Sequence, residues 1–585
     1  MKRFVIVFLL FLLFSLLLSQ IEKDDSYYNT HEYESLIFYE YFPLRINNIT
    51  KEKLKSFTFL DSLDINNIIV FNQKKLIKNE KDLRKAGLLQ QKIEILNKYI
   101  SYSKTNFETF FRIESFKDNL TQISSNKTYS STTYSSENIS FGFNSQKDEG
   151  ETDFLDYTSS FIKFSTKSKN SLILGNYKIG FGQGIVFGSP FLLNKSVQAT
   201  NSPLIKRYFV KPNSSFYENW LYNGAVLDFS FNTVSFVPFF SKSQLDATLK
   251  DNKISSFYEG GLHQNNSKKD VVEEKILGIY VEKDLFGSNI GVSFTKFHFD
   301  KGFIDESKNS SYNSFSANYN ILLNQITFFG EYATIDKKTG ELYGIKFGNR
   351  VLNQMWIYRN YEKNLITHRG NPFSASSKFD NEKGLYYGLS ICPNIKLEFN
   401  SYLDLWEYPK TSYLEKLPVS GFEQMYNIDY RFDKNQLKVK FKYLQKEEVK
   451  SGLFVDKKKY QYKLDYFHYY NRILTSKIRF EYDKEILNNT NDGILAYKKL
   501  TIKYPNTKIT GQITYYNSQL LIYMYENNIS GVSQTTSFKG EDFYYFILGK
   551  FKFRKNFYFE LKFSDYLIRE SKWRIYSKLG YKKSF

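Results

Sequence analysis

The chain has 585 residues, with 81 Lys and Arg against 61 Asp and Glu, so its formal net charge is +20. Aromatic residues make up 18% of it, which excludes a chain that is disordered throughout. Its single cysteine excludes a disulfide framework, an iron–sulfur cluster and a thiolate zinc site. A mean hydropathy of −0.46 excludes a polytopic helical membrane protein but leaves a membrane β-barrel open, because barrel strands alternate and form no long apolar run.

The first 20 residues are typical of a secretory signal peptide. Lys2 and Arg3 precede an apolar run from Phe4 to Leu18, which is short for a membrane span. An uncleaved membrane anchor is the alternative. Either reading sends the rest of the chain across a membrane.

Residues 21–103 show helical spacing of apolar side chains. Leu63, Ile65, Ile68 and Phe71 follow one such pattern, and a second runs from Leu83 to Ile100. Short polar connectors separate the patterns. We therefore expect a small all-α domain, and export places it in the periplasm.

The residue pattern of segments 46–54, 67–71 and 82–87 resembles that of the helix-hairpin-helix domain of competence-type DNA receptors. In that family a glycine-bearing hairpin offers backbone N–H groups to phosphates. Here the first hairpin, 57–63, lacks glycine, and the second keeps only Gly87. The resemblance implies DNA binding, whereas a solvated lysine-rich face is the alternative reading. The candidate DNA contacts are Lys51, Lys53, Lys55, Lys74, Lys75, Lys78, Arg84, Lys85 and Gly87.

From residue 104 to 585 the period changes to two. Val439, Phe441 and Tyr443 alternate with lysines, and Ile478 and Phe480 alternate with charged residues in the same way. A soluble sandwich or solenoid would bury the apolar face. Charges of both signs on the polar face and the export signal favour a large transmembrane antiparallel β-barrel instead. Aromatic pairs near strand ends, such as Tyr515-Tyr516 and Tyr544-Tyr545, are expected at the aromatic girdles of such a barrel. The length accommodates roughly 22–26 strands. Candidate strands include 106–117, followed by 137–146, and near the C-terminus 507–517 and 519–526.

The chain ends on an aromatic strand closing with Phe585. This terminal residue resembles the sorting signal read by the outer-membrane barrel assembly machinery. We therefore expect the outer membrane of a Gram-negative bacterium, with outer-membrane lipid and lipopolysaccharide as neighbours. Long connections near 189–218, 248–272 and 362–382 are long enough to fold into the lumen.

Several short motifs follow one another after residue 170. They are Leu174-Gly175-Asn176-Tyr177, Phe181-Gly182-Gln183-Gly184, Gly260-Gly261-Leu262-His263, Tyr358-Arg359-Asn360-Tyr361 and Asn381-Glu382-Lys383-Gly384. Their order and spacing resemble a family of large outer-membrane proteins that join a helix-hairpin-helix domain to a barrel. The resemblance implies an architecture and a location more than an activity.

Within these motifs, Arg359 and Glu382 are expected to form an interior ion pair that holds a loop in the lumen, with substrate binding as the alternative. Gly182, Gln183 and Gly184 mark a bend or close packing rather than a nucleotide loop, since no strand–helix–strand unit surrounds them. Gly260, Gly261 and His263 are expected in a lumen loop, although His263 beside Glu259 leaves acid–base chemistry open.

No catalytic or metal-binding motif is evident, and no cofactor is expected. The favoured function is a non-enzymatic barrel for transport, docking or scaffolding, with a periplasmic protein partner and polyanions as possible ligands. The alternatives are an envelope protein for DNA binding and uptake, and a barrel-embedded lipid-active enzyme.

Overall fold

The computed structural model describes residues 44–49, 54, 57, 60, 62–75, 77, 79–102, 105–117, 124–136, 138–148, 157–166, 170–189, 195–204, 208–213, 216, 220–257, 267–285, 288–349, 351–366, 368–376, 379–394, 396–411, 417–450, 453–471, 473–553, 556–568 and 572–584. The predicted signal peptide, the segment with Gly260, Gly261 and His263, and Phe585 lie outside these residues.

A small helical unit precedes the barrel. It contains α4 (Ser62–Lys74), α5 (Glu80–Lys85) and α6 (Gln90–Leu96), with the 3₁₀ turn η1 (Ile46–Asn48) before them. A parallel pair, β1 (Leu44–Arg45) and β2 (Ile100–Ser101), brings its two ends together. Leucine, isoleucine and phenylalanine side chains from all these segments share one buried core, so the unit has its own hydrophobic centre. None of the helices described here is long and apolar enough to cross a membrane.

The barrel strands follow in chain order. They are β3 (Asn106–Lys117), β4 (Ser124–Ser135), β5 (Ile139–Lys147), β6 (Tyr157–Ser165), β7 (Ser171–Gly180), β8 (Phe209–Pro212), β9 (Tyr222–Phe231), β10 (Val234–Leu245), β13 (Val272–Leu285), β14 (Ser288–Phe299), β15 (Ser311–Leu323), β16 (Ile326–Ile335), β17 (Lys338–Gly348), β18 (Leu352–Tyr361), β19 (Glu382–Asn394), β20 (Leu397–Tyr408), β21 (Val419–Phe432), β22 (Asn435–Lys450), β23 (Leu453–Tyr469), β24 (Leu474–Ile486), β25 (Thr490–Tyr504), β26 (Thr507–Glu526), β27 (Gln534–Phe553), β28 (Phe557–Tyr566) and β29 (Arg574–Ser584). A separate hairpin, β11 (Ala247–Lys250) and β12 (Lys253–Phe257), lies in the connection after β10.

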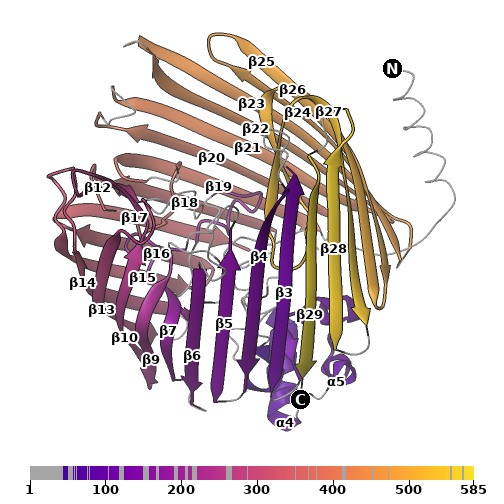
Figure 1. Cartoon of the computed structure of the whole chain (residues 1–585), viewed down its shortest axis with the longest axis horizontal. Coiled ribbons are helices and arrows are strands. Elements are labelled where there is room, and N and C mark those ends of the chain that lie inside the picture. Colours follow the sequence, from indigo (N-terminus) through magenta and orange to yellow (C-terminus); the bar gives the residue numbers. More distant parts are fainter. Residues whose placement is uncertain are drawn as a thin grey trace.

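Without the short β8, these strands form a closed antiparallel barrel of 24 strands (Figure 1). The short β8 pairs with one end of β7, while β9 pairs with the other end. The last strand closes the barrel on the first, with Arg574 opposite Phe116 and Ser584 opposite Asn106. This closure leaves no free strand edge, and it confirms the predicted fold class.

Side chains alternate between the two faces of the wall. Along β14 and β10, buried and exposed residues follow one another with a period of two. The exposed set is apolar on strand after strand, and includes Phe294, Phe315, Ile428, Val439, Phe480 and Ile547. Because charged residues take the other face, the apolar side chains point outward and the charged ones line the interior.

The two ends of the barrel differ in the length of their connections. At the end where β3 begins and β29 ends, neighbouring strands are joined by short turns, such as 232–233 and 324–325. At the other end the connections are longer, among them 181–221, 246–271 and 362–381. Figure 1 shows α4 and α5 at the end with the short turns, near the C-terminus.

Three details differ from the sequence-based expectations. The strand β4 was not expected, because Ser and Thr dominate Ser124–Ser135 and hide its alternation. Residues 519–526, expected as a separate strand, are the distal half of β26. The pairs Tyr515–Tyr516 and Tyr544–Tyr545 were expected at aromatic girdles, but Tyr516 and Tyr544 are buried inside the barrel.

Candidate functional site: the barrel interior

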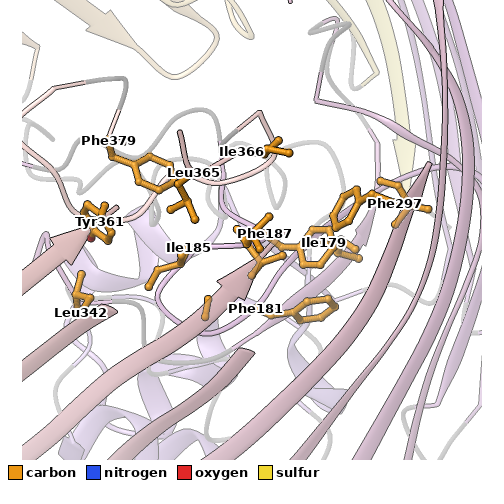
Figure 2. Close-up of a cluster of buried hydrophobic side chains, with 14 of the residues drawn as sticks. Ile179, Phe181, Ile185, Phe187, Phe297, Leu342, Tyr361, Leu365, Ile366 and Phe379 are labelled. Atoms are coloured by element: carbon orange, nitrogen blue, oxygen red, sulfur yellow. The ribbon is translucent and has the colours of Figure 1, made fainter. Parts of the chain in front are cut away.

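Segments of the long connections fold into the barrel and pack against one part of its inner wall. Figure 2 shows Phe181, Ile185 and Phe187 beside Leu365, Ile366 and Phe379, with wall residues such as Leu342 around them. Phe181 stacks on Tyr280 of β13 with ring centroids 4.4 Å apart. This packed part is a continuous hydrophobic core inside the barrel, where an open pore would have water.

The segment 181–189 is held by a buried carboxylate and by a second inward segment. Glu331 of β16 accepts hydrogen bonds from the backbone N–H of Gln183 at 2.6 Å and of Ile185 at 3.1 Å. The backbone N–H of Gly188 donates to the carbonyl of Arg369, and that of Asn371 donates to Gly184, both at 2.8 Å. The two segments therefore dock to each other by main-chain bonds.

Gly182 is needed for the close approach of this segment to the wall. Its φ of +58° lies in the left-handed region, and a Cβ there would sit 2.6 Å from the Glu331 carboxylate. Gly184 also has a positive φ, of +87°. The glycine-rich motif thus serves a tight turn against a buried acid.

The connection 362–381 is held by two buried charge clusters. At one, Glu274 of β13 accepts from Arg369 and from His368, whose Nε2 lies 2.5 Å from Oε1. At the other, the backbone N–H of Ala375 donates to Glu382 at 2.8 Å, and Arg359 donates from Nε to Glu382 at 2.5 Å and from Nη1 to Asp404 at 2.7 Å. These side chains are almost fully buried, so each charge depends on its partner.

The pKa values of both basic side chains of the first cluster, His368 and Arg369, are shifted. Burial lowers the pKa of the His368 imidazole, although Glu274 opposes this effect. Burial also disfavours the charged form of Arg369, but the Glu274 carboxylate outweighs it and raises the pKa of that guanidinium. The cluster therefore holds a neutral histidine beside a carboxylate already neutralised by arginine.

A third inward element comes from the β26–β27 hairpin, whose distal half, 519–539, turns down along the inner wall. Met524 lies 3.2 Å from Gln512 Nε2, and Glu526 accepts from Lys562 Nζ at 2.7 Å. Because Gln512 and Lys562 belong to the inner faces of β26 and β28, the hairpin lies inside the barrel. Its tip is held where Lys578 Nζ donates to the carbonyl of Ser530 at 3.1 Å.

The inner faces of β21–β24 are lined instead by charged side chains, and we call this surface the charged wall. Lys442 lies 3.1 Å from Glu423, Lys463 lies 3.0 Å from Glu481, and Asp465 binds Arg479 at 2.5 Å. The charged wall consists of Glu423, Asp429, Lys438, Lys440, Lys442, Lys457, Lys459, Lys463, Asp465, Lys477, Arg479, Glu481, Asp483 and Glu485.

The charged wall is wetter than the packed part of the lumen. Side chains such as Lys442 and Lys459 keep 32% and 30% of their surface exposed, whereas Arg359 and Asp404 keep none. The carboxylate partners of these two lysines, Glu423 and Asp483, keep only 8% and 2%, so it is the lysine side chains that are positioned to contact water and small solutes. Within the described ranges, no group of three or more His, Cys, Asp or Glu side chains is arranged to hold a metal ion.

The candidate residues in the helical unit fall in several places. Lys75, Arg84, Lys85 and Gly87 are exposed, and Gly87 has a φ of +94° in the turn between α5 and α6. Arg84 Nε donates to Gln90 at 2.6 Å. Lys74 ends α4, while Lys51, Lys53, Lys55 and Lys78 lie outside the described residues. DNA binding by this unit stays a prediction.

Comparisons with known proteins give weak similarities. No family model and no curated protein matches the chain. Among solved structures, the siderophore receptor PirA from Pseudomonas aeruginosa is 8% identical, with a TM-score of 0.41 over 82% of this chain and 80% of that one. The copper transporter OprC has the same identity and TM-score over 82% and 81%. OccAB4 of Acinetobacter baumannii is 10% identical, with a TM-score of 0.29 over 83% and 99%. Similarities this low do not identify a function.

Proposed function

We propose that this chain is a non-enzymatic outer-membrane β-barrel that passes hydrophilic solutes along its charged wall. The observation that carries the proposal is the contrast inside one barrel. One part of the inner wall is dry and packed by folded-in segments, while the inner faces of β21–β24 carry ion pairs whose lysines, such as Lys442 and Lys459, are partly exposed to the lumen. A scaffold would gain nothing from hydrated charge in its interior, whereas a conduit needs it.

The lipid contact rests on the outer face. Large apolar side chains such as Phe240, Leu277 and Tyr462 are exposed there by 45%, 63% and 46%, on strands spread over the wall. Patches this extensive are unstable in water and suit acyl chains. Lipid and lipopolysaccharide are therefore the expected neighbours.

The orientation follows from the two ends of the barrel. Outer-membrane barrels have short periplasmic turns and longer extracellular loops. By this rule the helical unit and the C-terminus face the periplasm, where the unit is positioned to meet a protein partner, and the barrel assembly machinery reads the C-terminal strand. The folded-in segments then enter from the extracellular side and act as a constriction.

Ion conductance in planar bilayers tests the proposal. The purified protein is expected to conduct, and the double variant Lys442→Glu with Lys459→Glu is expected to shift the reversal potential in a salt gradient toward cation selectivity. A matched control is Lys383→Glu with Lys242→Glu, at half-exposed lysines away from the charged wall. Absence of conductance, or equal shifts in both variants, would contradict passage along the charged wall.

A further inference from the structure

The inward half of the β26–β27 hairpin has two different faces. Ile522, Met524 and Phe538 point to the barrel wall and are fully buried. Phe538 packs on Tyr516 and Tyr544, with ring centroids 4.8 and 5.4 Å away. Leu521, Tyr523 and Tyr525 alternate with them along the strand, so they point away from the wall toward the centre of the barrel.

The side chains on the face that points to the centre of the barrel are unusually exposed for apolar and aromatic residues. Leu521, Tyr523 and Tyr525 keep 47%, 58% and 55% of their surface accessible, although they lie inside the barrel. Inside an aqueous lumen such a row costs free energy unless something covers it. We call these three residues the lumen strip.

Polar groups border the lumen strip on the adjacent strand. Tyr523 is opposite Ser537 and Tyr525 is opposite Thr535 in the antiparallel register. Both hydroxyl residues are exposed, as is Lys539 further along. Residues two apart on a strand are about 6.8 Å apart, so the tyrosines form successive aromatic platforms with hydroxyl groups beside them.

The hairpin is fixed in place, which suits a binding surface. Gly540 has a φ of +86° where β27 turns inward, and the Ser518 side chain occupies the space beside Gly493 on β25. The tip is held by Lys550, whose Nζ donates to Ser530 Oγ at 2.9 Å, and by the carboxylate of Glu560. Such anchoring reduces the entropy that binding would cost.

We propose that the lumen strip binds neutral oligosaccharides within the conduit, an inference that rests on the proposed function. Sugar rings carry apolar C–H faces and polar edges, so they pack on tyrosine rings while their hydroxyls bond Ser537, Thr535 and water. The position inside the barrel selects a solute over a protein. Leu521, Tyr523 and Tyr525 and the bordering Ser537 and Thr535 carry no charge, which selects a neutral ligand at this surface.

Equilibrium binding to the full chain in detergent tests this inference without requiring conduction. The probes are linear hexasaccharides of glucose, galactose and N-acetylglucosamine, with oligogalacturonate as the anionic comparison. At least one neutral hexasaccharide is expected to bind, and Tyr523→Ser and Tyr525→Ser are each expected to weaken it about tenfold. Tyr504→Ser, at a tyrosine 54% exposed on the outer face, is the matched control and should leave affinity unchanged.

The outcomes separate this inference from the proposed function. Conductance with no binding of any neutral hexasaccharide at millimolar concentration overturns the lumen strip as a sugar site and leaves the conduit intact. Binding of oligogalacturonate alone also overturns it. Sugar binding that depends on Tyr523 and Tyr525 in a non-conducting protein supports the site and contradicts passage.

Discussion

Arg359 and Asp404 form a two-pronged ion pair inside the barrel. Arg359 Nη1 lies 2.7 Å from Oδ1, and Nη2 lies 3.3 Å from Oδ2. Lys195, from the inward connection after β7, binds the same Asp404 Oδ2 at 2.7 Å. Glu382 binds Arg359 and also accepts from the backbone N–H of Ala375 at 2.8 Å. One wall arginine therefore ties together two separate folded-in segments.

Replacing this arginine should loosen both segments. Arg359→Ala leaves the buried Glu382 without its cation and leaves Asp404 with Lys195 alone, and loss of a partner from a buried ion pair typically costs about 3–5 kcal/mol. We expect a lower unfolding temperature in detergent. Arg431→Ala, at a guanidinium 41% exposed and 3.7 Å from Asp429, is the matched control and should change the unfolding temperature little. An unchanged melting point in Arg359→Ala would argue against this role.

Glu331 is expected to hold segment 181–189 in its folded position against the wall. Glu331→Gln puts an amide where two backbone N–H groups now meet a carboxylate, so those bonds weaken. Hydrogen exchange at Gln183 and Ile185 should become faster, while exchange in distant strands stays the same. Glu341→Gln, whose carboxylate accepts from the Asn360 side chain, serves as the control. Equal exchange in both variants contradicts the assignment.

Acidification should destabilise the connection 362–381 through His368. Its folded-state pKa lies below the ordinary value, so the unfolded chain binds the proton first as the pH falls below about 6.5. Stability conferred by neutral His368 is therefore present at pH 7 and is lost toward pH 5. Arg369 and Glu274 are the charged groups in contact with it.

Limited proteolysis of this connection at pH 7.5 and pH 5 measures the effect. The wild type should become more susceptible at pH 5, and His368→Gln, whose amide can still donate to Glu274, should show a smaller change. Equal acid sensitivity in the two proteins contradicts the role of His368. Carboxylates elsewhere affect both proteins alike and cancel in the comparison.

Shortening the β26–β27 hairpin should widen the conduit. Joining Ser518 to Gly540 through a short glycine–serine turn removes the inward half and its apolar cluster. We expect a several-fold increase in single-channel conductance in planar bilayers. Inserting residues between β22 and β23, in the connection 451–452, is the control for altering a connection at the same end. A decrease or no change would mean that the hairpin does not constrict the passage.

The alternation of apolar and polar residues predicted most of the barrel because the two faces of each strand meet different surroundings. It failed at β4, where hydroxyl groups satisfy one another across strands: Thr109 Oγ1 lies 2.9 Å from Thr132 Oγ1, and Ser130 Oγ lies 2.8 Å from Ser145 Oγ. Paired hydroxyls remove the need for apolar side chains there. It also gave no sign that β26 bends inward after Ser518, since the period of two continues through the bend.

The interior was less predictable from sequence than the wall. Arg359 and Glu382 stood out through their motif, but Asp404, Glu331, Glu274 and Arg369 did not, because their partners come from distant segments. The sequence did contain one signal of a buried carboxylate. Glu331 lies at an inward position of its strand, between inward residues that are small or apolar. The partner depends on how long connections fold, and local patterns do not encode that.

Labelling of single cysteines in liposomes tests most directly whether the apolar face meets lipid and the charged wall meets water. In a Cys392→Ser background, Lys442→Cys places a thiol on the charged wall, and Val439→Cys places one on the outer face, where Val439 is 40% exposed. A membrane-impermeant maleimide should label position 442 rapidly and leave position 439 unlabelled until detergent is added. Rapid labelling of position 439 in intact liposomes, or protection of position 442, would contradict this account.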